Sequence, residues 1–348
     1  MLHPFNSAVQ FPESVAPTSP TISVAICTHN GAPYIAEQVR SICQQTRLPF
    51  ELVLSDDASG DGCVDIARNA HAQCVAEAPS RQMPALKVLQ NSAALGITRN
   101  FEQAVRVCCG DVIALCDQDD VWRSDKLACL SSEFERRPDL VLLHTDAQLV
   151  DDALVPLPQS LFEALGVSTS EFAQIHEGQA FDVYLRRNLV TGATTAFRRP
   201  LLDDALPFPT EWLHDEWLAI IAAATSEADL LNAQLIQYRQ HGSNQVGAQR
   251  ITLGAKIRKA LASRGQDPER RRVKAQVLLT RLLALGDKLP ADRVAKARSK
   301  LEHQRLRAAL PANRVARWFP IAREIRTGRY QAFDYGLEGV LRDLLEAE

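Results

Sequence analysis

Acidic and polar side chains follow three apolar, β-branched runs of the sequence, at the point where each run ends. Thr28-His29-Asn30 follows TISVAIC, Asp56-Asp57 follows FELVLS, and Asp117-Gln118-Asp119-Asp120 follows DVIALC. Runs of this kind are typical of buried parallel strands, whose carboxyl ends meet at one edge of a sheet. Five carboxylates gathered there repel one another unless a cation neutralises them. The spacing therefore predicts a site for Mg²⁺ or Mn²⁺, hard ions that take oxygen ligands and bridge phosphates.

Two later segments add titratable side chains to this set. Asp215 and Glu216 open the apolar helical pattern LHDEWLAIIAAAT, where they could act chemically or could favour the positive end of the helix dipole. His241 stands beside Gly242 after a predicted strand, either close to a ligand or as a solvated loop residue.

Three other residues have a functional and a structural interpretation each. Trp122 could face a sugar or belong to the core, and Arg99 could contact a nucleotide or lie on a helix surface. Gly192 in VTGATT could allow a ligand to approach closely or could mark a strand kink.

The elements that must position these residues alternate regularly between strand and helix. Such alternation predicts a doubly wound, mostly parallel α/β sheet that binds ligands at the carboxyl ends of its strands. Neither G-x-G-x-x-G nor G-x-x-x-x-G-K-[ST] is present, which argues against a dinucleotide fingerprint and a P-loop. The predicted strands are 21–27, 50–56, 86–91 and 111–120, and the predicted helices between them are 34–46, 63–71 and 98–108.

At this point the blocks ISVAICTHNG, ELVLSDDASGDG, LGITRNFEQAV and DVIALCDQDDVW resemble glycosyltransferase family 2, which has the GT-A fold. The later blocks VTGATTAFRR, LHDEWLA and QYRQHGSN follow in the order of that family, so the resemblance covers about residues 21–247. Within the family, the chain resembles bacterial rhamnosyltransferase-like members. The resemblance implies an inverting, metal-dependent transferase that uses a nucleotide-diphosphate sugar.

The resemblance also implies roles at the donor nucleotide. Asp57 would bind the pyrimidine, and Thr28-His29-Asn30 would line the base and ribose, with His29 standing where many members have Tyr. Arg99 would lie near the base or diphosphate. Asp117-Gln118-Asp119 matches the D-x-D signature, in which Asp117 would face the ribose and Gln118 would line the nucleotide site.

Roles at the reacting end follow from the same resemblance. Asp119 would hold the metal, His241 would approach the metal and diphosphate, and Asp215 would be the catalytic base. The pocket for the donor sugar or the acceptor would involve Trp122, Gly192 and Glu216. The reaction needs a carboxylate that takes a proton from the acceptor hydroxyl, and Asp215 would supply it. It also needs a cation that stabilises the leaving diphosphate, and Asp119 would hold that cation.

The implied reaction moves a sugar, with L-rhamnose from dTDP-rhamnose as the first expectation, to a lipid-linked saccharide in surface polysaccharide synthesis of the O-antigen type. A UDP-hexose or UDP-GlcNAc donor is the alternative within the family. A sugar nucleotidyltransferase is a rival, although THNGAPY lacks the Gly-rich loop and basic residue expected of one. A non-catalytic sugar-nucleotide-binding scaffold is the other rival.

Charge divides the chain into two unlike parts. The whole chain has a net charge of −3, yet residues 250–330 hold 22 Lys and Arg against 6 Asp and Glu. Apolar residues recur there at helical spacing, so amphipathic helices are predicted. They either pack on the catalytic domain or contact an anionic inner membrane. No nucleic-acid-binding module accompanies the charge, and no nucleic-acid partner is expected.

Length and composition complete the expectations. A chain of 348 residues, 46% hydrophobic and 23% charged, is globular, and no apolar stretch reaches the length of a membrane span. The first residues lack a signal peptide, so a cytoplasmic location is expected. The eight cysteines, without metal-site spacing, are expected to be reduced and buried. We predict a flexible tail (1–20), a catalytic domain (21–247, with a nucleotide half to about 125 and an acceptor half from about 126) and a basic helical region (248–348).

Overall fold

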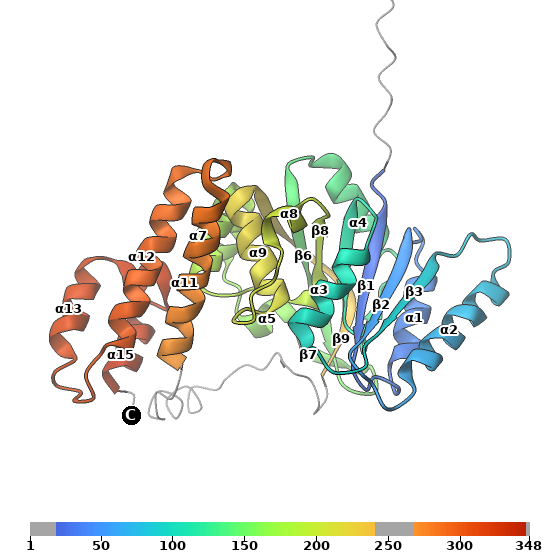
Figure 1. Ribbon diagram of the computed structural model, residues 1–348, viewed down its shortest axis with the longest axis horizontal. Helices are drawn as coiled ribbons and strands as arrows, with labels where there is room; N and C mark the ends of the chain where they lie inside the picture. The colour runs from blue at the N-terminus through green and yellow to red at the C-terminus, as the bar shows by residue number, and fades with distance from the viewer. Residues whose placement is uncertain (1–18, 241–266, 346–348) are drawn as a thin grey trace, which may run out of the picture.

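A single nine-stranded sheet with helices on both faces forms the larger part of the molecule (Figure 1). The computed structural model describes residues 19–240 and 267–345. The sheet order is β3-β2-β1-β4-β8-β6-β9-β5, and β7 pairs with β6. The strands are β1 (Ile22–Thr28), β2 (Glu51–Asp56), β3 (Ala85–Gln90), β4 (Val112–Cys116), β5 (Val121–Trp122), β6 (Leu140–Val150), β7 (Pro156–Ser160), β8 (Thr195–Arg198) and β9 (Glu227–Arg239).

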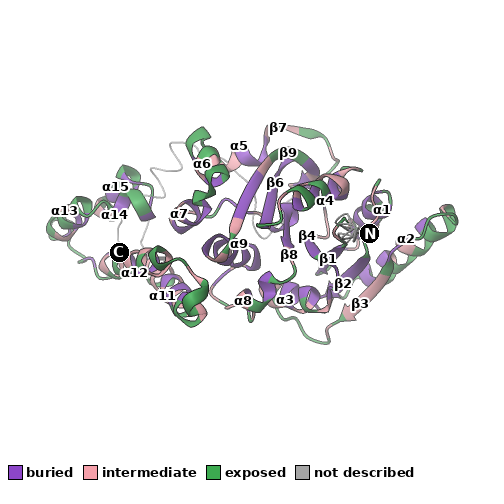
Figure 2. Cartoon of the chain, turned by 90° about the horizontal axis from the view of Figure 1, so that it is seen from above, coloured by how far each residue is buried: buried purple, intermediate pink, exposed green. Residues whose placement is uncertain are grey.

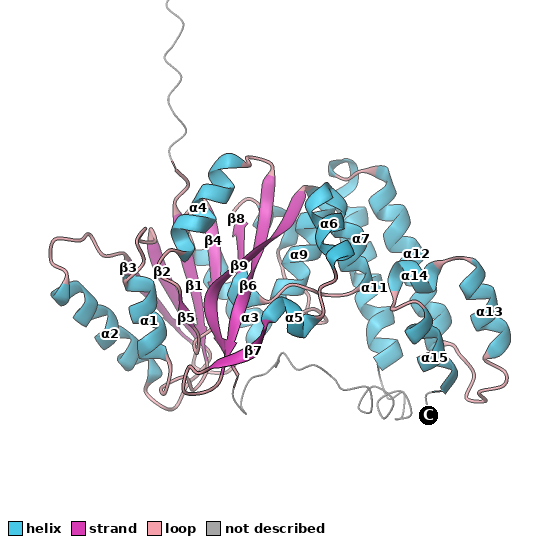
Figure 3. Ribbon diagram, turned by 180° about the vertical axis from the view of Figure 1, so that it is seen from behind, coloured by secondary structure: helices cyan, strands magenta, loops and turns pink. Residues whose placement is uncertain are grey.

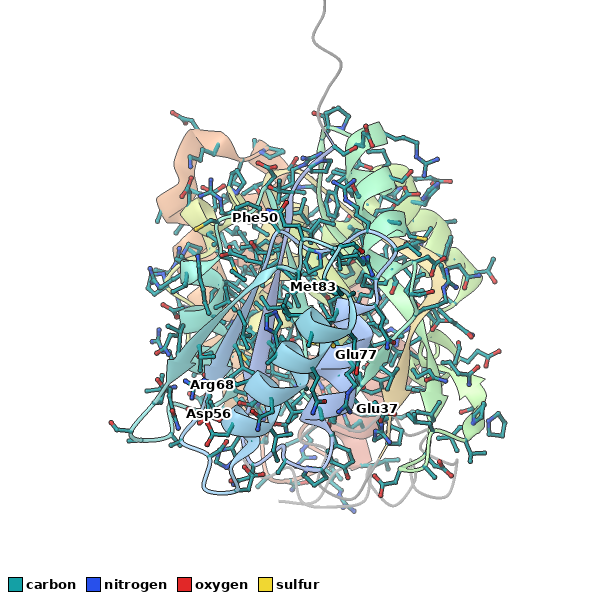
Figure 4. The ribbon with its side chains drawn as sticks, turned by 90° about the vertical axis from the view of Figure 1, so that its right-hand side faces the viewer. Glu37, Phe50, Asp56, Arg68, Glu77 and Met83 are labelled. Carbon is teal, nitrogen blue, oxygen red and sulfur yellow. The ribbon has the colours of Figure 1, made fainter. Side chains whose placement is uncertain are left out.

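The four strands predicted first form the parallel half of the sheet, and helical crossovers join them. Those helices are α1 (Ile35–Cys43), α2 (Cys63–Glu77) and α3 (Ile97–Val107). The register pairs Thr28 with Asp56 and Ile26 with Cys116, so β1, β2 and β4 end side by side. Phe50, just before β2, and Asp56, at its end, lie at opposite ends of the sheet in Figure 4.

Side chains of β1 alternate between two cores. Val24 and Ile26 pack with residues of α1, α2 and α4 (Lys126–Arg136), whereas Ala25 and Cys27 pack with residues of α3, α7 (Ala180–Arg186) and α9 (His214–Thr225). Because successive strand residues face opposite sides of a sheet, a wholly apolar strand needs helices over both faces. Figure 2 shows the resulting buried layer between the helices. The predicted doubly wound α/β class is confirmed.

The second half of the sheet differs from the sequence-based expectation in detail. In the block VTGATTAFRR, Gly192–Thr194 forms a 3-10 turn, and strand β8 begins only after it. The acids after β4 lie in a loop, and β5 then pairs antiparallel with β9. Residues 154–183 contain β7, α5 (Leu161–Leu165), α6 (Thr169–Gln174), a π-helical turn (Ile175–Gln179) and the start of α7. Helix α8 (Leu201–Ala205) follows β8.

The C-terminal residues from 267 onward are helical, as their periodicity predicts. They form α11 (Asp267–Leu285), a 3-10 turn (Gly286–Lys288), α12 (Ala291–Ala308), α13 (Trp318–Arg326), α14 (Arg329–Phe333) and α15 (Leu337–Leu345). Figure 3 shows these helices beyond α7, at the end of the molecule opposite β3. Leu278 and Leu282 of α11 and Leu301 of α12 belong to the same core cluster as α7 and α9. This part of the chain therefore packs directly on the α/β part.

Most of one predicted segment and one predicted boundary lie outside the described part of the chain. The predicted tail (1–20) is described only at Ser19 and Pro20. The predicted boundary between residues 247 and 248 also lies outside the described residues. Both therefore stay predictions.

All eight cysteines lie among the described residues and are free thiols. Six are buried, as expected, but Cys109 is exposed and Cys129 is half-buried. Burial raises the pKa of Cys108 to about 12, so this thiol stays protonated and apolar in character. In the described part of the chain, no helix combines the length and the apolar character needed to cross a bilayer.

Candidate functional site

A cavity of about 680 Å³ opens at the carboxyl ends of β1, β2 and β4. Its other wall consists of residues 188, 190–192 and 213–215, which precede β8 and begin α9. Nine of the predicted site residues line it together, namely Thr28, His29, Asn30, Asp57, Asp117, Gln118, Asp119, Gly192 and Asp215. The position agrees with the rule that open α/β sheets bind ligands beyond the carboxyl ends of their strands.

His29 is held in one orientation by its neighbours. Its Nδ1 donates to the Asp57 carbonyl at 2.7 Å, and its Nε2 accepts from the Asn30 amide at 3.2 Å. Gln118 fixes the backbone of His29, because its Oε1 accepts from His29 N at 2.8 Å and its Nε2 donates to His29 O at 3.2 Å. A Cβ at Gly31 would lie 2.3 Å from Gln118 Oε1, so only glycine admits this contact. The His29 imidazole is thus held in a fixed position at the edge of the cavity.

The Asp57 carboxylate organises the loop before α3. Its Oδ1 accepts from Leu95 N at 2.6 Å and its Oδ2 accepts from Gly96 N at 2.9 Å. Each carboxylate oxygen has a second lone pair, so the group can still accept a hydrogen bond from a ligand. Asp57 therefore both shapes the cavity wall and presents an acceptor to it.

Negative charge is concentrated around the loop after β4. The pKa of Asp117 is raised to about 7, because burial removes water and because Asp119 and Asp215 add negative charge. Asp120 is buried next to them, where its Oδ1 accepts from Arg239 N at 3.0 Å and its Oδ2 has no partner among the described residues. Burial, followed by the charges of Asp119 and Asp117, raises the pKa of Asp120 as well.

This donor set fits a hard divalent cation. Asp117 and Asp119 offer carboxylate oxygens to the cavity, and their mutual repulsion would fall if a cation bound between them and a ligand. Within residues 19–240 and 267–345, no group of three His, Cys, Asp or Glu side chains is placed to coordinate an ion alone. Phosphate oxygens and water would have to complete the coordination, as is usual for Mg²⁺.

Asp215 sits in the first turn of α9 and is buried against the cavity wall. Its Oδ2 accepts from Gly192 N at 2.8 Å and its Oδ1 accepts from Glu216 N at 2.7 Å. Burial raises the pKa of Asp215 above its usual range, although the two backbone donors and Lys274 oppose that shift. A carboxylate with these properties suits a general base, which needs a fixed direction and sufficient basicity.

Three predicted residues are not brought into the cavity. Arg99 Nη1 pairs with Glu102 at 2.7 Å on the surface of α3, and Glu216 pairs with Lys274 at 2.5 Å outside the cavity. Trp122 is buried in the core, with Lys126 Nζ 3.8 Å from its ring centroid. Arg99 thus lies on a helix surface and Trp122 in the core, whereas Glu216 is engaged in an ion pair. A fourth predicted residue, His241, lies outside the described part of the chain.

Sequence reasoning did not single out the cations that support the acidic loop. Lys126 is fully buried, donates to Ala193 O at 2.8 Å, and has its pKa lowered to about 8 by burial. Arg239 Nε donates to Asp119 O at 2.8 Å. Both residues stand at the ends of apolar patterns, where a charged residue suggests a surface position. The sequence offers one signal for such cations: the acidic side chains that follow β4 need a compensating positive charge nearby.

His214 has surroundings that are unusual for a structural histidine. The ring is buried, stacks on Phe101 with centroids 3.8 Å apart, and lines the cavity. Neither ring nitrogen has a hydrogen-bond partner among the described residues, and burial lowers the pKa of His214 to about 3. The imidazole is therefore neutral.

The fold and the acidic cavity at the sheet edge define an α/β protein of the GT-A type. The model of glycosyl transferase family 2 matches residues 23–206, more than half of the chain, and the chain belongs to this family. The resemblance predicted from the sequence is thus confirmed for the family.

Relatives of known sequence are distant. An uncharacterized glycosyltransferase of Nostoc sp. is 26% identical over 227 residues, which cover 64% of this chain and 66% of the relative. An uncharacterized protein of Mycobacterium tuberculosis is 24% identical over 228 residues, 63% of this chain and 59% of the relative. The chain thus spans about three fifths of the length of that relative. The abequosyltransferase of Salmonella typhimurium is 32% identical over 126 residues, 35% of this chain and 34% of the relative.

Solved structures share the fold at low sequence identity. Residues 1–349 of Staphylococcus aureus TarS in complex with UDP align with a TM-score of 0.51 and 19% identity, over 82% of this chain and 71% of that chain. The complex of the same protein with UDP-GlcNAc aligns with a TM-score of 0.50 and 18% identity, over 93% and 90%. This likeness supports the fold assignment.

Proposed function

We propose that the protein is an inverting glycosyltransferase that moves a sugar from a nucleoside diphosphate to a saccharide acceptor. The observation that carries the proposal is the convergence of Asp117, Asp119 and Asp215 on one cavity at the sheet edge. In this reaction an acceptor oxygen forms a bond to the anomeric carbon while the bond from that carbon to the diphosphate breaks. The acceptor proton passes to the base, and the nucleoside diphosphate leaves.

Five residues of the cavity have a part in this reaction. Asp215 takes the proton, because two backbone donors fix its direction and burial raises its pKa. Asp119, with Asp117, would hold a divalent cation, which when bound stabilises the negative charge of the leaving diphosphate. Asp57 accepts a base N–H, and His29 would stack on the base where many members use Tyr.

The donor is proposed to be dTDP-L-rhamnose, with a UDP-hexose or UDP-GlcNAc as the alternative. The acceptor is proposed to be a lipid-linked saccharide of a surface polysaccharide at the inner face of the cytoplasmic membrane. Two relatives support this class of product by their names, the abequosyltransferase and a putative teichuronic acid biosynthesis glycosyltransferase of Bacillus subtilis, 31% identical over 108 residues.

Donor binding and donor hydrolysis test the proposal together. The purified protein is heated with dTDP-, UDP- and GDP-sugars in Mn²⁺, Mg²⁺ or EDTA, since a ligand of the native state raises Tm. One donor class should raise Tm and be slowly hydrolysed in metal but not in EDTA. Asp215→Asn should retain the Tm shift while lowering hydrolysis about a hundredfold, and Asp119→Asn should lose the metal-dependent part of the shift.

Asp65→Asn is the matched control, because this carboxylate is exposed on α2 and its ion pair among the described residues is with Arg68, across a surface turn. It should behave as the unmodified protein. Hydrolysis that survives both Asp119→Asn and Asp215→Asn would overturn the assignment of these residues, and of this cavity, to the reaction. Donor binding without any turnover would favour the scaffold alternative.

Contact with an anionic membrane is proposed through the C-terminal helices. Trp318 and Phe319 of α13 are 61% and 81% exposed, and α13 packs against α15, where Leu337, Leu341 and Leu345 are exposed at helical spacing. Exposed arginines accompany them at positions 314, 323 and 326. Apolar side chains with arginines around them suit a surface of anionic lipid, where each cation adds about 1 kcal/mol.

Sedimentation with lipid vesicles tests the membrane contact. The protein should bind phosphatidylcholine vesicles that contain phosphatidylglycerol more tightly than vesicles that lack it. The double variant Trp318→Ser and Phe319→Ser should weaken binding about tenfold or more, because apolar area is lost. Phe50→Ser is the control, since Phe50 is 55% exposed on the α/β part of the molecule. Equal binding by all three proteins would contradict the proposed surface.

A further inference from the structure

A second cavity, of about 280 Å³, lies where the C-terminal helices meet the α/β part. Its walls come from α7 and Trp212 on one side and from α11, α12 and the segment 333–335 on the other. Figure 2 shows α7 and α9 facing α11, α12 and α14 around this region. We call it the basic cavity, because among the described residues seven Lys and Arg side chains line it, with two carboxylates, Glu216 and Asp334.

The two lining carboxylates are both already engaged by cations of the basic cavity. Glu216 pairs with Lys274 at 2.5 Å, and Asp334 pairs with Arg342 at 2.7 Å and also with Arg307. Neither carboxylate pairs with Arg186 or Lys300 among the described residues. Arg186 is therefore a lining cation whose positive charge a ligand could meet.

Two lining side chains have unmet hydrogen-bonding capacity. The Nε of Arg186 is buried and has no hydrogen-bond partner among the described residues. No carboxylate of the described residues pairs with the Arg186 guanidinium either. Gln304 is 1% exposed, and its Oε1 is buried without a partner in the same part of the chain. Buried polar groups are normally hydrogen-bonded, and an unpaired buried group is costly. Arg186 Nε thus indicates a ligand that supplies an acceptor, whereas Gln304 Oε1 is itself an acceptor and does not favour an anion.

Lys300 shows the effect of the crowded charges. Its Nζ donates to the carbonyl oxygen of Phe333 at 2.6 Å, a neutral partner. The pKa of Lys300 is lowered to about 7, mainly by burial; Asp334 opposes the shift, and Arg307, Arg271 and Lys274 contribute to it. An anion in the cavity would relieve this repulsion.

The basic cavity adjoins the cavity at the sheet edge. Asn188 lines both, and its side chain bonds to Val190 N and O at 2.9 Å and 3.0 Å, which fixes the strip between them. Asp215 and Glu216 are consecutive in α9, yet Asp215 lines the sheet-edge cavity and Glu216 lines the basic one. The two cavities are therefore neighbours, separated by the strip around Asn188 and by the first turn of α9.

We propose that the basic cavity binds the phosphate or diphosphate group that joins the acceptor saccharide to its lipid. The identity of the acceptor rests on the proposed function. The binding of an anion rests on the residues of the cavity alone. Its volume equals that of about nine liquid water molecules, which leaves room for a diphosphate. Arginine suits this group, because its planar fork binds phosphate oxygens in pairs.

Calorimetric titration of the full chain in EDTA tests the anion site without metal-dependent donor binding. Inorganic pyrophosphate and farnesyl diphosphate are the probes, and farnesol is the uncharged comparison. Both diphosphates should bind, and farnesol should not. Arg186→Gln should weaken both diphosphates about tenfold, because one hydrogen-bonded charge is lost, and Arg186→Lys should recover part of the affinity.

Arg305→Gln is the matched control, since Arg305 is exposed on α12, lies outside the cavity and bonds to the Gln276 side chain at 2.9 Å. It should leave all titrations unchanged. Equal affinity in Arg186→Gln and Arg305→Gln would overturn the site. Binding of pyrophosphate with exclusion of farnesyl diphosphate would overturn the lipid-linked source.

The two proposals fail separately. Donor hydrolysis by the unmodified protein tests the glycosyltransferase function and does not involve the diphosphate titration. Hydrolysis together with unaltered titrations in Arg186→Gln would leave the function and remove the anion site. Arg186-dependent titrations without any hydrolysis would support the anion site and refute the proposed enzyme.

Discussion

Gly192 is the position where the smallest substitution should disturb the proposed catalytic carboxylate most. A Cβ at Gly192 would lie 2.9 Å from His214 Nε2 and 3.7 Å from the Asp215 Cβ. The His214 ring cannot withdraw freely, because it is buried and stacks on Phe101. Gly192→Ala must therefore displace the 192–194 turn or the start of α9, and either movement stretches the 2.8 Å bond from Gly192 N to Asp215.

The size of the effect follows from these contacts. Forcing a methyl group into a packed site costs about 1–3 kcal/mol, which should lower the Tm of Gly192→Ala by several degrees. A hydrogen bond to a charged group contributes about 1.5–3 kcal/mol, so its loss at Asp215 should reduce the rate about 10- to 100-fold. Donor affinity should change little, because Asp57, His29 and Gln118 lie on the opposite wall.

Donor hydrolysis and thermal unfolding of three variants measure these effects. Gly60→Ala is the matched control, because open space surrounds the position of its Cβ. Gly192→Ala combined with His214→Ala should recover part of the Tm if the ring is the obstacle. The reasoning is refuted if Gly192→Ala unfolds and turns over like Gly60→Ala.

Three other perturbations have definite expectations. Because burial raises the pKa of Asp215, kcat/KM should fall as the pH is lowered, with an inflection above ~3.9, the usual pKa of aspartate. An inflection below that pH in the measured profile would exclude Asp215 as the base. Asp57→Ala should weaken donor binding about tenfold and speed amide exchange at residues 95–96, which lose their acceptor; unchanged exchange would contradict the loop contact. Lys126→Met should lower the free energy of unfolding by about 3 kcal/mol and tighten Mn²⁺ binding, because Asp120 and its neighbours lose a buried counter-charge. Denaturation with and without Mn²⁺ measures both effects. An unchanged free energy of unfolding would contradict the role of Lys126.

Strands and helices with a strong apolar pattern could be predicted from the sequence. The β1, β2 and β4 runs are buried on both faces, so their composition alone indicates parallel strands. Strands β5 and β7 could not be predicted, because they are short and take their identity from pairing with β9 and β6. The residues around Gly192–Thr194 have a pattern that is typical of one strand, yet they form a turn. The turn could not be predicted, because it depends on the close approach of Gly192 to the start of α9, which is a tertiary contact.

The part of the candidate site that directly follows strand ends could be predicted from the sequence. The residues that belong to other elements and reach the site by packing could not. Asp57, Asp117 and Asp119 follow from topology, because the register of β1, β2 and β4 places them at one edge. Lys126 belongs to α4, and its burial beneath the acids depends on how that helix packs. Arg99 matched the family pattern, yet in the structure Glu102, one helical turn away, holds its guanidinium on the surface.

The first turn of α9 connects the two cavities electrostatically. Successive helix residues point about 100° apart, so Asp215 and Glu216 face different spaces although they share one peptide bond. Glu216 holds Lys274, and the charge of Lys274 lowers the pKa of Asp215 against the larger effect of burial. An anion bound beside Lys274 would offset that charge and raise the pKa of Asp215 further. The proposed acceptor would thus strengthen the base that takes its proton, and an empty basic cavity would leave that base weaker.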